Sequence, residues 1–141
     1  MSQTNHRFAV SVHILTLLAA NEDNLLTSDA IATSVNTNPV VIRRTMSHLR
    51  RHGLVDSRPG TSGGWRLVRP AAQISLGEIY RVVSHEDVLS MHNHPNPDCL
   101  VGGNIQAPLT AVFGRAEDAM QTELDGFTVA DILQDVVARA G

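Results

Sequence analysis

The sequence predicts a mainly α-helical protein that contains one small β-hairpin. Three features of its 141 residues lead to this fold class. Apolar residues recur at helical spacing over most of the chain, a glycine-rich turn separates two short extended runs, and a long apolar stripe follows Gly103. The hydrophobic content of 43% is sufficient for a core, and the aromatic content of 4% means that Val, Leu, Ile and Ala must form most of it.

The first predicted helix covers residues 5–20 and is apolar over most of its girth. Such a helix is largely buried, so we expect it beneath the other helices and also at a subunit contact. A polar turn over residues 21–24 follows. Thr27 or Ser28 then caps a short helix over residues 29–35, in which Asp29 lies favourably near the positive N-terminus.

The third predicted helix, over residues 38–52, is rich in arginine. Asn38 is a suitable N-cap, Pro39 suits the first helical position, and Gly53 is suited to end the helix in a left-handed conformation. The apolar residues expected to face the core are Ile42, Met46 and Leu49. The opposite face is predicted to consist of Val40, Arg44, Ser47, His48 and Arg51, with Arg43 and Arg50 at its edges.

Two extended runs, residues 54–58 and 65–69, follow this helix with the turn-forming sequence PGTSGG between them. We expect a hairpin whose base is anchored by Trp65. Helix, short helix, turn, helix and hairpin is the order of a winged helix-turn-helix domain, which places its third helix in the major groove of DNA and the wing beside it. The predicted DNA-binding residues are Asn38, Val40, Arg43, Arg44, Ser47, His48 and Arg51 of the helix, and Arg58 and Arg66 of the wing.

The distribution of charge supports binding to double-stranded DNA. Residues 37–70 hold seven arginines and one acid, whereas the remaining residues hold four arginines and thirteen acids, for a net charge of −3. One basic module in a mildly acidic chain directs a single face toward a polyanion. The chain has no lysine, and arginine favours bidentate contacts with phosphate and guanine. The alternative is that these arginines form only a solvated helix face.

The rest of the chain is predicted to contain a closing helix, a loop and two further helices. Ser75 and Glu78 have the spacing of a capping box for a helix over residues 76–84, which completes a DNA-binding domain of residues 1–84. Residues 85–101 have no periodicity and form an effector or sensor loop. Residues 102–141 hold a dimerisation helix, which Gly126 ends, and a last helix over 129–139, which Thr128 and Asp131 open and which could pack back on the body.

The stripe of the dimerisation helix has no obvious partner within the chain. A second copy is the expected partner, because monomeric proteins rarely expose a large contiguous apolar patch. The predicted residues of this homodimer interface are Ile105, Leu109, Val112, Phe113, Ala116 and Met120.

The loop contains the single cysteine of the chain, Cys99, together with His85, His92 and His94. One cysteine excludes an intrachain disulfide and fits a reducing cytoplasm. A helix N-terminus close behind Cys99 would lower the pKa of its thiol, which makes it a candidate redox sensor; the alternative is a loop or buried residue without that role. The histidines and Cys99 are ligand types for Zn²⁺, but their spacing matches no firm zinc motif, so we predict no metal site and no cofactor.

An enzyme is not predicted, because the sequence contains no nucleophile elbow, phosphate-binding loop or metalloprotease helix. The enzymatic alternative is Cys99 as a nucleophile with His92 or His94 as its base. The apolar segment over residues 8–20 is interrupted by polar residues and too short to span a bilayer, so neither a signal peptide nor a membrane anchor is expected and the predicted location is the cytoplasm.

The segment over residues 42–83 resembles the Rrf2 family of bacterial transcription regulators. The resemblance extends over roughly residues 6–135 and depends on LRRHGLV at 49–55, GGW at 63–65 and ISL at 74–76. It implies a homodimer that binds a pseudo-palindromic operator, usually as a repressor, with a possible small-molecule or redox effector. The best-known branch holds an iron–sulfur cluster with three loop cysteines, whereas only Cys99 matches here, so the resemblance is to the branch without the cluster. The alternative is a winged helix that docks a metabolic enzyme as a protein-interaction module.

Overall fold

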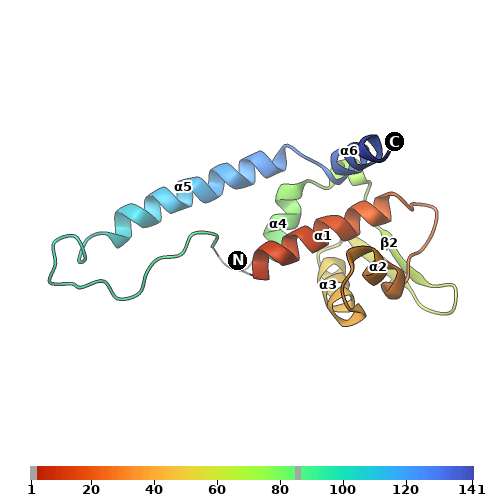
Figure 1. Cartoon of the computed structure of the whole chain (residues 1–141), viewed down its shortest axis with the longest axis horizontal. Coiled ribbons are helices and arrows are strands. Elements are labelled where there is room, and N and C mark those ends of the chain that lie inside the picture. Colours follow the sequence, from red (N-terminus) through yellow and green to blue (C-terminus); the bar gives the residue numbers. More distant parts are fainter. Residues whose placement is uncertain (1–2, 85–86) are drawn as a thin grey trace.

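The computed structural model describes residues 3–84 and 87–141 and confirms the predicted fold class. Figure 1 shows a helical body with a small hairpin, from which one long helix and a loop project. The elements in chain order are α1 (Gln3–Ala19), α2 (Ser28–Val35), α3 (Pro39–Arg51), β1 (Val55–Arg58), β2 (Gly64–Leu67), the 3₁₀ turn η1 (Ala71–Gln73), α4 (Leu76–Val83), α5 (Gln106–Asp125) and α6 (Val129–Ala140).

The ends of the first helices are set by the local signals that the sequence carries. Thr27 and Asn38 each accept a hydrogen bond from a backbone N–H three residues further on, which satisfies one unpaired donor of α2 and of α3. Asn36 ends α2 in the left-handed region at φ 64°, and Gly53 follows α3 at φ 76°. The helix-turn-helix segment is therefore fixed by its own sequence before any tertiary contact is considered.

The predicted capping box at the start of α4 forms only in half. The Ser75 hydroxyl accepts a hydrogen bond from the N–H of Glu78 at 3.0 Å, but the Glu78 carboxylate binds the guanidinium of Arg69 instead of returning the bond. This part of the prediction is wrong, because an arginine offers a carboxylate two charge-assisted bonds and a backbone N–H offers one neutral bond. The complete capping box of the chain is at Thr128 and Asp131, where both reciprocal bonds are present.

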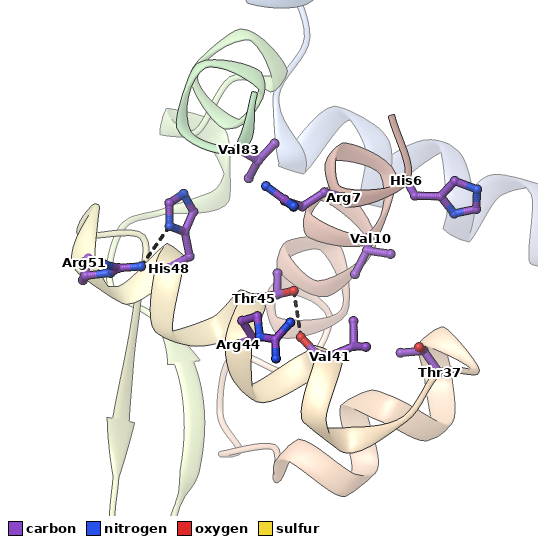
Figure 2. Close-up of a pocket in the computed structure, with 10 residues that line it drawn as sticks. All are labelled: His6, Arg7, Val10, Thr37, Val41, Arg44, Thr45, His48, Arg51 and Val83. Atoms are coloured by element: carbon purple, nitrogen blue, oxygen red, sulfur yellow. Dashed lines mark hydrogen bonds between the residues drawn. The ribbon is translucent and has the colours of Figure 1, made fainter. Parts of the chain in front are cut away.

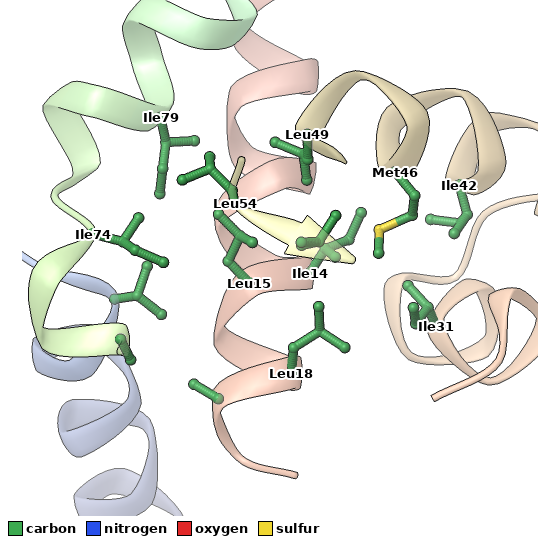
Figure 3. Close-up of a cluster of buried hydrophobic side chains, with 14 of the residues drawn as sticks. Ile14, Leu15, Leu18, Ile31, Ile42, Met46, Leu49, Leu54, Ile74 and Ile79 are labelled. Carbon is green, nitrogen blue, oxygen red and sulfur yellow. The ribbon is translucent and has the colours of Figure 1, made fainter. Parts of the chain in front are cut away.

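The core lies around α1, which passes through the middle of the body (Figure 3). Ile42, Met46 and Leu49 of α3 are fully buried there, as predicted. The other large side chains that are fully buried in this cluster are Ile14, Leu15, Leu18, Ile31, Leu54, Val55, Ile74, Ile79 and Val83. Helices α2, α3, α4 and α6 thus all contact α1, and the burial of one side of α3 fixes which side of it remains outside.

The hairpin is tied to the body through Trp65, as the sequence predicts. β1 and β2 are antiparallel, and the backbone of Trp65 extends the pairing by exchanging hydrogen bonds of 2.8 and 3.1 Å with Leu26. The indole N–H donates to the hydroxyl of Ser28 at 3.2 Å. Trp65 therefore holds the base of the wing against the start of α2.

The C-terminal helix α6 packs back on the body, with Val129 fully buried in the core cluster. Its approach is fixed by two backbone hydrogen bonds, from Val129 to the carbonyl of Ile74 and from Leu76 to the carbonyl of Phe127. By contrast, none of the residues of α5 is buried, and this helix projects beyond the body (Figure 1). None of the described helices is both long enough and apolar enough to cross a membrane.

The second half of α5 contacts α4 through polar side chains. The Tyr80 hydroxyl donates to Glu117 at 2.6 Å, and burial together with this bond raises the pKa of Tyr80, so the phenol remains a donor. Arg81 pairs with Asp125 at 2.8 Å. The predicted start of this helix at Gly103 is wrong by three residues, because the N–H of Gly103 bonds the carbonyl of Cys99 in a turn before Gln106.

We predict that Gly64→Ala destabilises the wing more than Gly60→Ala does. Both glycines have positive φ, 154° and 103°, but a Cβ on Gly64 would lie 2.7 Å from the carbonyl oxygen of Leu26, whereas a Cβ on Gly60 meets nothing within 4 Å. The clash should cost about 1–3 kcal/mol of unfolding free energy beyond the strain that both variants share. Urea denaturation followed by circular dichroism measures the difference, and equal losses in the two variants would contradict the packing described for Trp65.

Candidate nucleic-acid interface

The arginines of the described structure divide into two groups by their partners. Arg66, Arg69, Arg81 and Arg139 each have a carboxylate within 4.0 Å. The arginines without a carboxylate partner among the described residues are Arg7, Arg43, Arg44, Arg50, Arg51, Arg58 and Arg115. All of these except Arg115 belong to α1, α3 or the wing, so the uncompensated positive charge is gathered on one part of the body.

The outer face of α3 carries the polar residues that the sequence placed there. Arg43, Arg44, Ser47 and Arg51 are exposed, and Val40 is 53% exposed. This follows from the burial of the opposite side, since about 3.6 residues per turn leave these positions pointing outward. Asn38 is also exposed, but its side-chain oxygen accepts the N–H of Val41 and caps the helix, so only its amide nitrogen is available to a ligand.

His48 is half-buried at one edge of this face, and its ring connects α3 with α4. Nε2 lies 2.8 Å from the carbonyl oxygen of Val82, and Nδ1 lies 3.2 Å from Nη2 of Arg51. Arginine can only donate, so Nδ1 accepts and Nε2 carries the proton that is donated to the carbonyl. His48 therefore orients Arg51 (Figure 2), while its direct contact with DNA stays a prediction.

The opposite edge of α3 is connected to the wing. Arg50 donates to the hydroxyl of Ser57 at 3.2 Å, and its guanidinium carbon lies 5.8 Å from the ring centre of Trp65. These contacts set the position of the wing relative to α3. Arg58 and Arg66 on the two strands are exposed, and Arg66 is only 4.0 Å from Asp56 in a weak surface pair. The wing can therefore present both guanidinium groups to a ligand beside α3.

A groove of about 490 Å³ lies on the side of α3 that faces away from the wing (Figure 2). The N-terminal part of α1 and the end of α4 form its other walls. The lining residues are His6, Arg7, Val10, Thr37, Val41, Arg44, Thr45, His48, Arg51 and Val83, with no acid among them. His6 and Arg7 are not among the site residues predicted from the sequence, although Arg7 is the one arginine of residues 1–36.

Cys99 is exposed in the loop before α5. Backbone N–H groups of Gly102 and Val101 lower the pKa of its thiol, because both stabilise the thiolate. The pKa of the Cys99 thiol is thus lowered, as predicted, but the predicted cause is wrong. The helix begins only at Gln106, and the donors belong to the turn that precedes it.

The alternative of a metal site finds no support in the described loop. His92 and His94 are exposed, and no three His, Cys, Asp or Glu side chains of residues 3–84 and 87–141 are grouped so that they could hold a metal ion. His85 lies outside the described residues.

The predicted dimer stripe lies along α5 with much of its surface accessible. Val112 is 57% exposed, Ala116 is exposed, and Ile105, Leu109, Phe113 and Met120 are half-buried. The loop residues Leu89 and Met91 line a pocket together with Phe113, and α4 contacts α5 through Tyr80 and Glu117. The rest of the chain therefore covers only part of this stripe and leaves Val112 and Ala116 exposed. Its role as an interface between two copies stays a prediction.

Comparison with known proteins gives a consistent result over nearly the whole chain. Residues 4–135 match the model of the Rrf2 family, which is described as an iron-dependent transcriptional regulator. YwnA of Bacillus subtilis strain 168, named as an HTH-type transcriptional regulator, is 42% identical over 130 residues, which cover 92% of this chain and 96% of YwnA.

Two solved structures have the same fold over similar lengths. The crystal structure of a transcriptional regulator from Lactobacillus plantarum superposes with a TM-score of 0.80 at 28% identity, covering 92% of this chain and 89% of the other. IscR of T. potens superposes with a TM-score of 0.70 at 26% identity, covering 96% and 87%. These structures confirm the predicted winged helix with a long additional helix.

The family's description names iron, and an iron–sulfur cluster would need suitable ligands in this chain. Cys99 is the single cysteine, and a [2Fe–2S] cluster takes four protein ligands. Two copies of the chain supply two thiolates, and the described histidines of the loop do not gather around Cys99. The residues present therefore do not fit an iron–sulfur cluster.

We predict that the Cys99 thiol ionises at lower pH in the folded protein than in the unfolded chain. The N–H groups of Gly102 and Val101 favour the thiolate only while the turn is formed. The rate of alkylation by iodoacetamide, measured against pH, should have its midpoint at lower pH in buffer than in concentrated urea. The same midpoint in both conditions would contradict the assigned hydrogen bonds.

Proposed function

The chain belongs to the Rrf2 family of transcriptional regulators, and we propose that it binds a pseudo-palindromic operator as a homodimer and represses transcription there. The family is described as transcriptional regulators, and YwnA is named as an HTH-type transcriptional regulator, which supports DNA binding. The observation that carries the proposal is the collection of arginines without carboxylate partners on α3 and the wing. A protein-docking face would not need this excess of one charge, whereas a DNA backbone does.

In the proposed complex, α3 lies in the major groove. Arg43 and Arg44 near its N-terminal half reach base edges, where a bidentate arginine–guanine contact specifies sequence. Asn38, Val40 and Ser47 lie on the same exposed surface and contact bases or the backbone. Arg51 is held by His48 at the far end of the helix and contacts phosphate.

The proposed place of the wing is the minor groove beside α3. Arg58 and Arg66 are exposed on its two strands, and narrow A·T-rich minor grooves attract arginine through their enhanced negative potential. Arg50 supports this arrangement without contacting DNA itself, because its guanidinium is placed over Trp65 and bonded to Ser57.

The proposed dimer forms through α5. The stripe from Ile105 to Met120 has the apolar character that a second copy would bury, and none of its residues is fully buried within the chain. A two-fold axis at this helix would place two α3 helices about 34 Å apart, one turn of DNA, which is the spacing that a pseudo-palindromic operator requires. We also propose the division that follows from this role: residues 1–84 bind DNA, residues 85–101 receive a signal, and residues 102–141 begin with the dimerisation helix.

A redox or metabolite signal is the proposed input of the loop, with Cys99 as its reactive group. The thiol is exposed, and the turn around it supplies two backbone donors that stabilise a thiolate. The thiolate attacks one oxygen of hydrogen peroxide and the O–O bond breaks. That oxygen stays on sulfur as the sulfenic acid, and the hydroxide that leaves takes up a proton to give water. The alkylation measurement described above tests whether Cys99 has the reactivity that this role needs.

We predict that Arg44→Ala weakens binding to the operator by about 1–3 kcal/mol and relaxes specificity, because a base contact is lost. Arg51→Ala should weaken binding to operator and random duplex by a similar factor, as expected for a phosphate contact. Operator sequences selected from a random pool, followed by fluorescence anisotropy at fixed salt, provide the measurement. Arg139→Ala is the matched control. This arginine lies on α6, outside the proposed DNA-binding surface, and its guanidinium is paired with Asp135 of the same helix.

Unchanged operator affinity for Arg44→Ala, with normal binding by the control, would remove Arg44 from the recognition surface. Failure of the unmodified protein to bind any duplex at low salt would remove the proposed function as a whole.

We predict that Leu109→Asp combined with Phe113→Asp yields a monomer whose affinity for DNA falls toward the nonspecific level. Full burial of one Leu or Phe is worth about 1.5–3 kcal/mol, and each substitution acts twice across a two-fold interface. Ala107→Asp combined with Ala111→Asp places the same charges on the opposite side of α5 and should leave the dimer intact. Sedimentation at micromolar concentration distinguishes the species, and a wild-type monomer that binds a palindrome tightly would contradict the dimer.

A further inference from the structure

We propose that the groove between α1 and α3 binds one backbone phosphate of the bound DNA and that Arg7 is the residue that contacts this phosphate. The inference rests on the proposed DNA binding and adds to it a contact from outside the helix-turn-helix and the wing. Arg7 lies on α1, far in sequence from the arginine-rich segment, and the fold brings it to the edge of α3 (Figure 2).

The charges of the groove favour an oxyanion. Arg7, Arg44 and Arg51 line it together with His6, and none of the described residues that line it is Asp or Glu. None of the three arginines has a carboxylate partner among the described residues. Like charges held close together repel one another, so a negatively charged group that enters the groove relieves this repulsion and gains charge-assisted hydrogen bonds.

The orientation of the cations also favours one ligand between them. In Figure 2, Arg7 extends from α1 across the groove toward Val83 and His48, while His6 points away. His48 accepts the hydrogen bond of Arg51 and is itself fixed to the carbonyl of Val82. One of the guanidinium groups is therefore restrained before any ligand arrives, which reduces the entropy lost when the ligand binds.

The remaining walls suit the sugar next to a phosphate. Val10 and Val41 provide apolar surface, and the Thr45 hydroxyl donates to the carbonyl of Val41 at 2.9 Å, so its hydrogen is not offered to an anion. The groove thus offers guanidinium groups that can hydrogen-bond an anion, together with an apolar surface beside them. A deoxyribose with its phosphate matches this combination better than a fully polar anion does.

The position of the groove indicates the DNA backbone as the source of that phosphate. Arg44 and Arg51 belong both to the groove and to the exposed face of α3, so the groove opens onto the surface proposed to meet the duplex. The wing lies on the other side of α3, where Arg50 contacts Ser57. A helix in the major groove is flanked by both strands, and this arrangement places the groove against the strand on the side of α3 away from the wing.

The test is the salt dependence of DNA binding by the full-length protein. Each phosphate contact contributes about 0.9 to the slope of log K against log salt concentration, and a homodimer has two copies of Arg7. Arg7→Ala should therefore reduce the slope by about two and weaken binding about sixtyfold at 0.1 M salt. The loss should be the same for operator and random duplex, because a phosphate carries no sequence information. Arg7→Lys should retain the slope, and Arg115→Ala, which removes an equally unpaired arginine from α5, should change nothing.

A free phosphorylated molecule is the other source of the same chemistry. Calorimetric titration of the DNA-free protein with inorganic phosphate, at constant ionic strength, should give no saturable binding. An unchanged slope for Arg7→Ala overturns the proposal, and so does saturable phosphate binding that Arg7→Ala abolishes while the DNA slope stays the same. These outcomes are distinct from failure of the proposed function, in which the unmodified protein does not bind DNA or Arg44→Ala has no effect.

Discussion

The burial of one side of α3 against α1 is the constraint on which the rest of the structure depends. Ile42, Met46 and Leu49 are fully buried, and burying three such side chains contributes on the order of 5–9 kcal/mol, comparable with the whole stability of a small domain. Rotating the helix to hide its arginines would forfeit this gain and place unpaired guanidinium groups in an apolar core. The exposed position of the arginine face is therefore a consequence of the core.

Pairing with a carboxylate separates the arginines that connect elements of the fold from those that are proposed to contact DNA. Glu78 holds Arg69 at the end of the wing, and Asp125 holds Arg81 where α5 meets α4, so these cations connect elements and are neutralised. On α3, the partners of Arg50 and Arg51 are neutral groups instead of carboxylates. Arg50 is steadied by Trp65 and Ser57, and Arg51 by His48, which leaves their full charge available.

The sequence predicted what local chemistry determines and missed what the fold brings together. Caps at Thr27, Asn38 and Thr128 were recognisable because each acts within three residues of itself. The buried and exposed sides of α3 followed from helical periodicity. The contribution of Arg7 to the groove did not, because it depends on how α1 crosses α3, and a lone arginine in an apolar helix carries no motif.

Two other differences have the same origin in contacts that are distant along the chain. Glu78 has the correct spacing for a capping box, yet Arg69 outcompetes the backbone N–H for its carboxylate. His48 belongs to the polar face by periodicity, yet its ring nitrogen Nε2 hydrogen-bonds the carbonyl of Val82. α4 thus hydrogen-bonds α3 at one end, through His48, and α5 along its length, through Tyr80 and Arg81. The helix α4 therefore connects the arginine face with α5, because Val82, Tyr80 and Arg81 all belong to it.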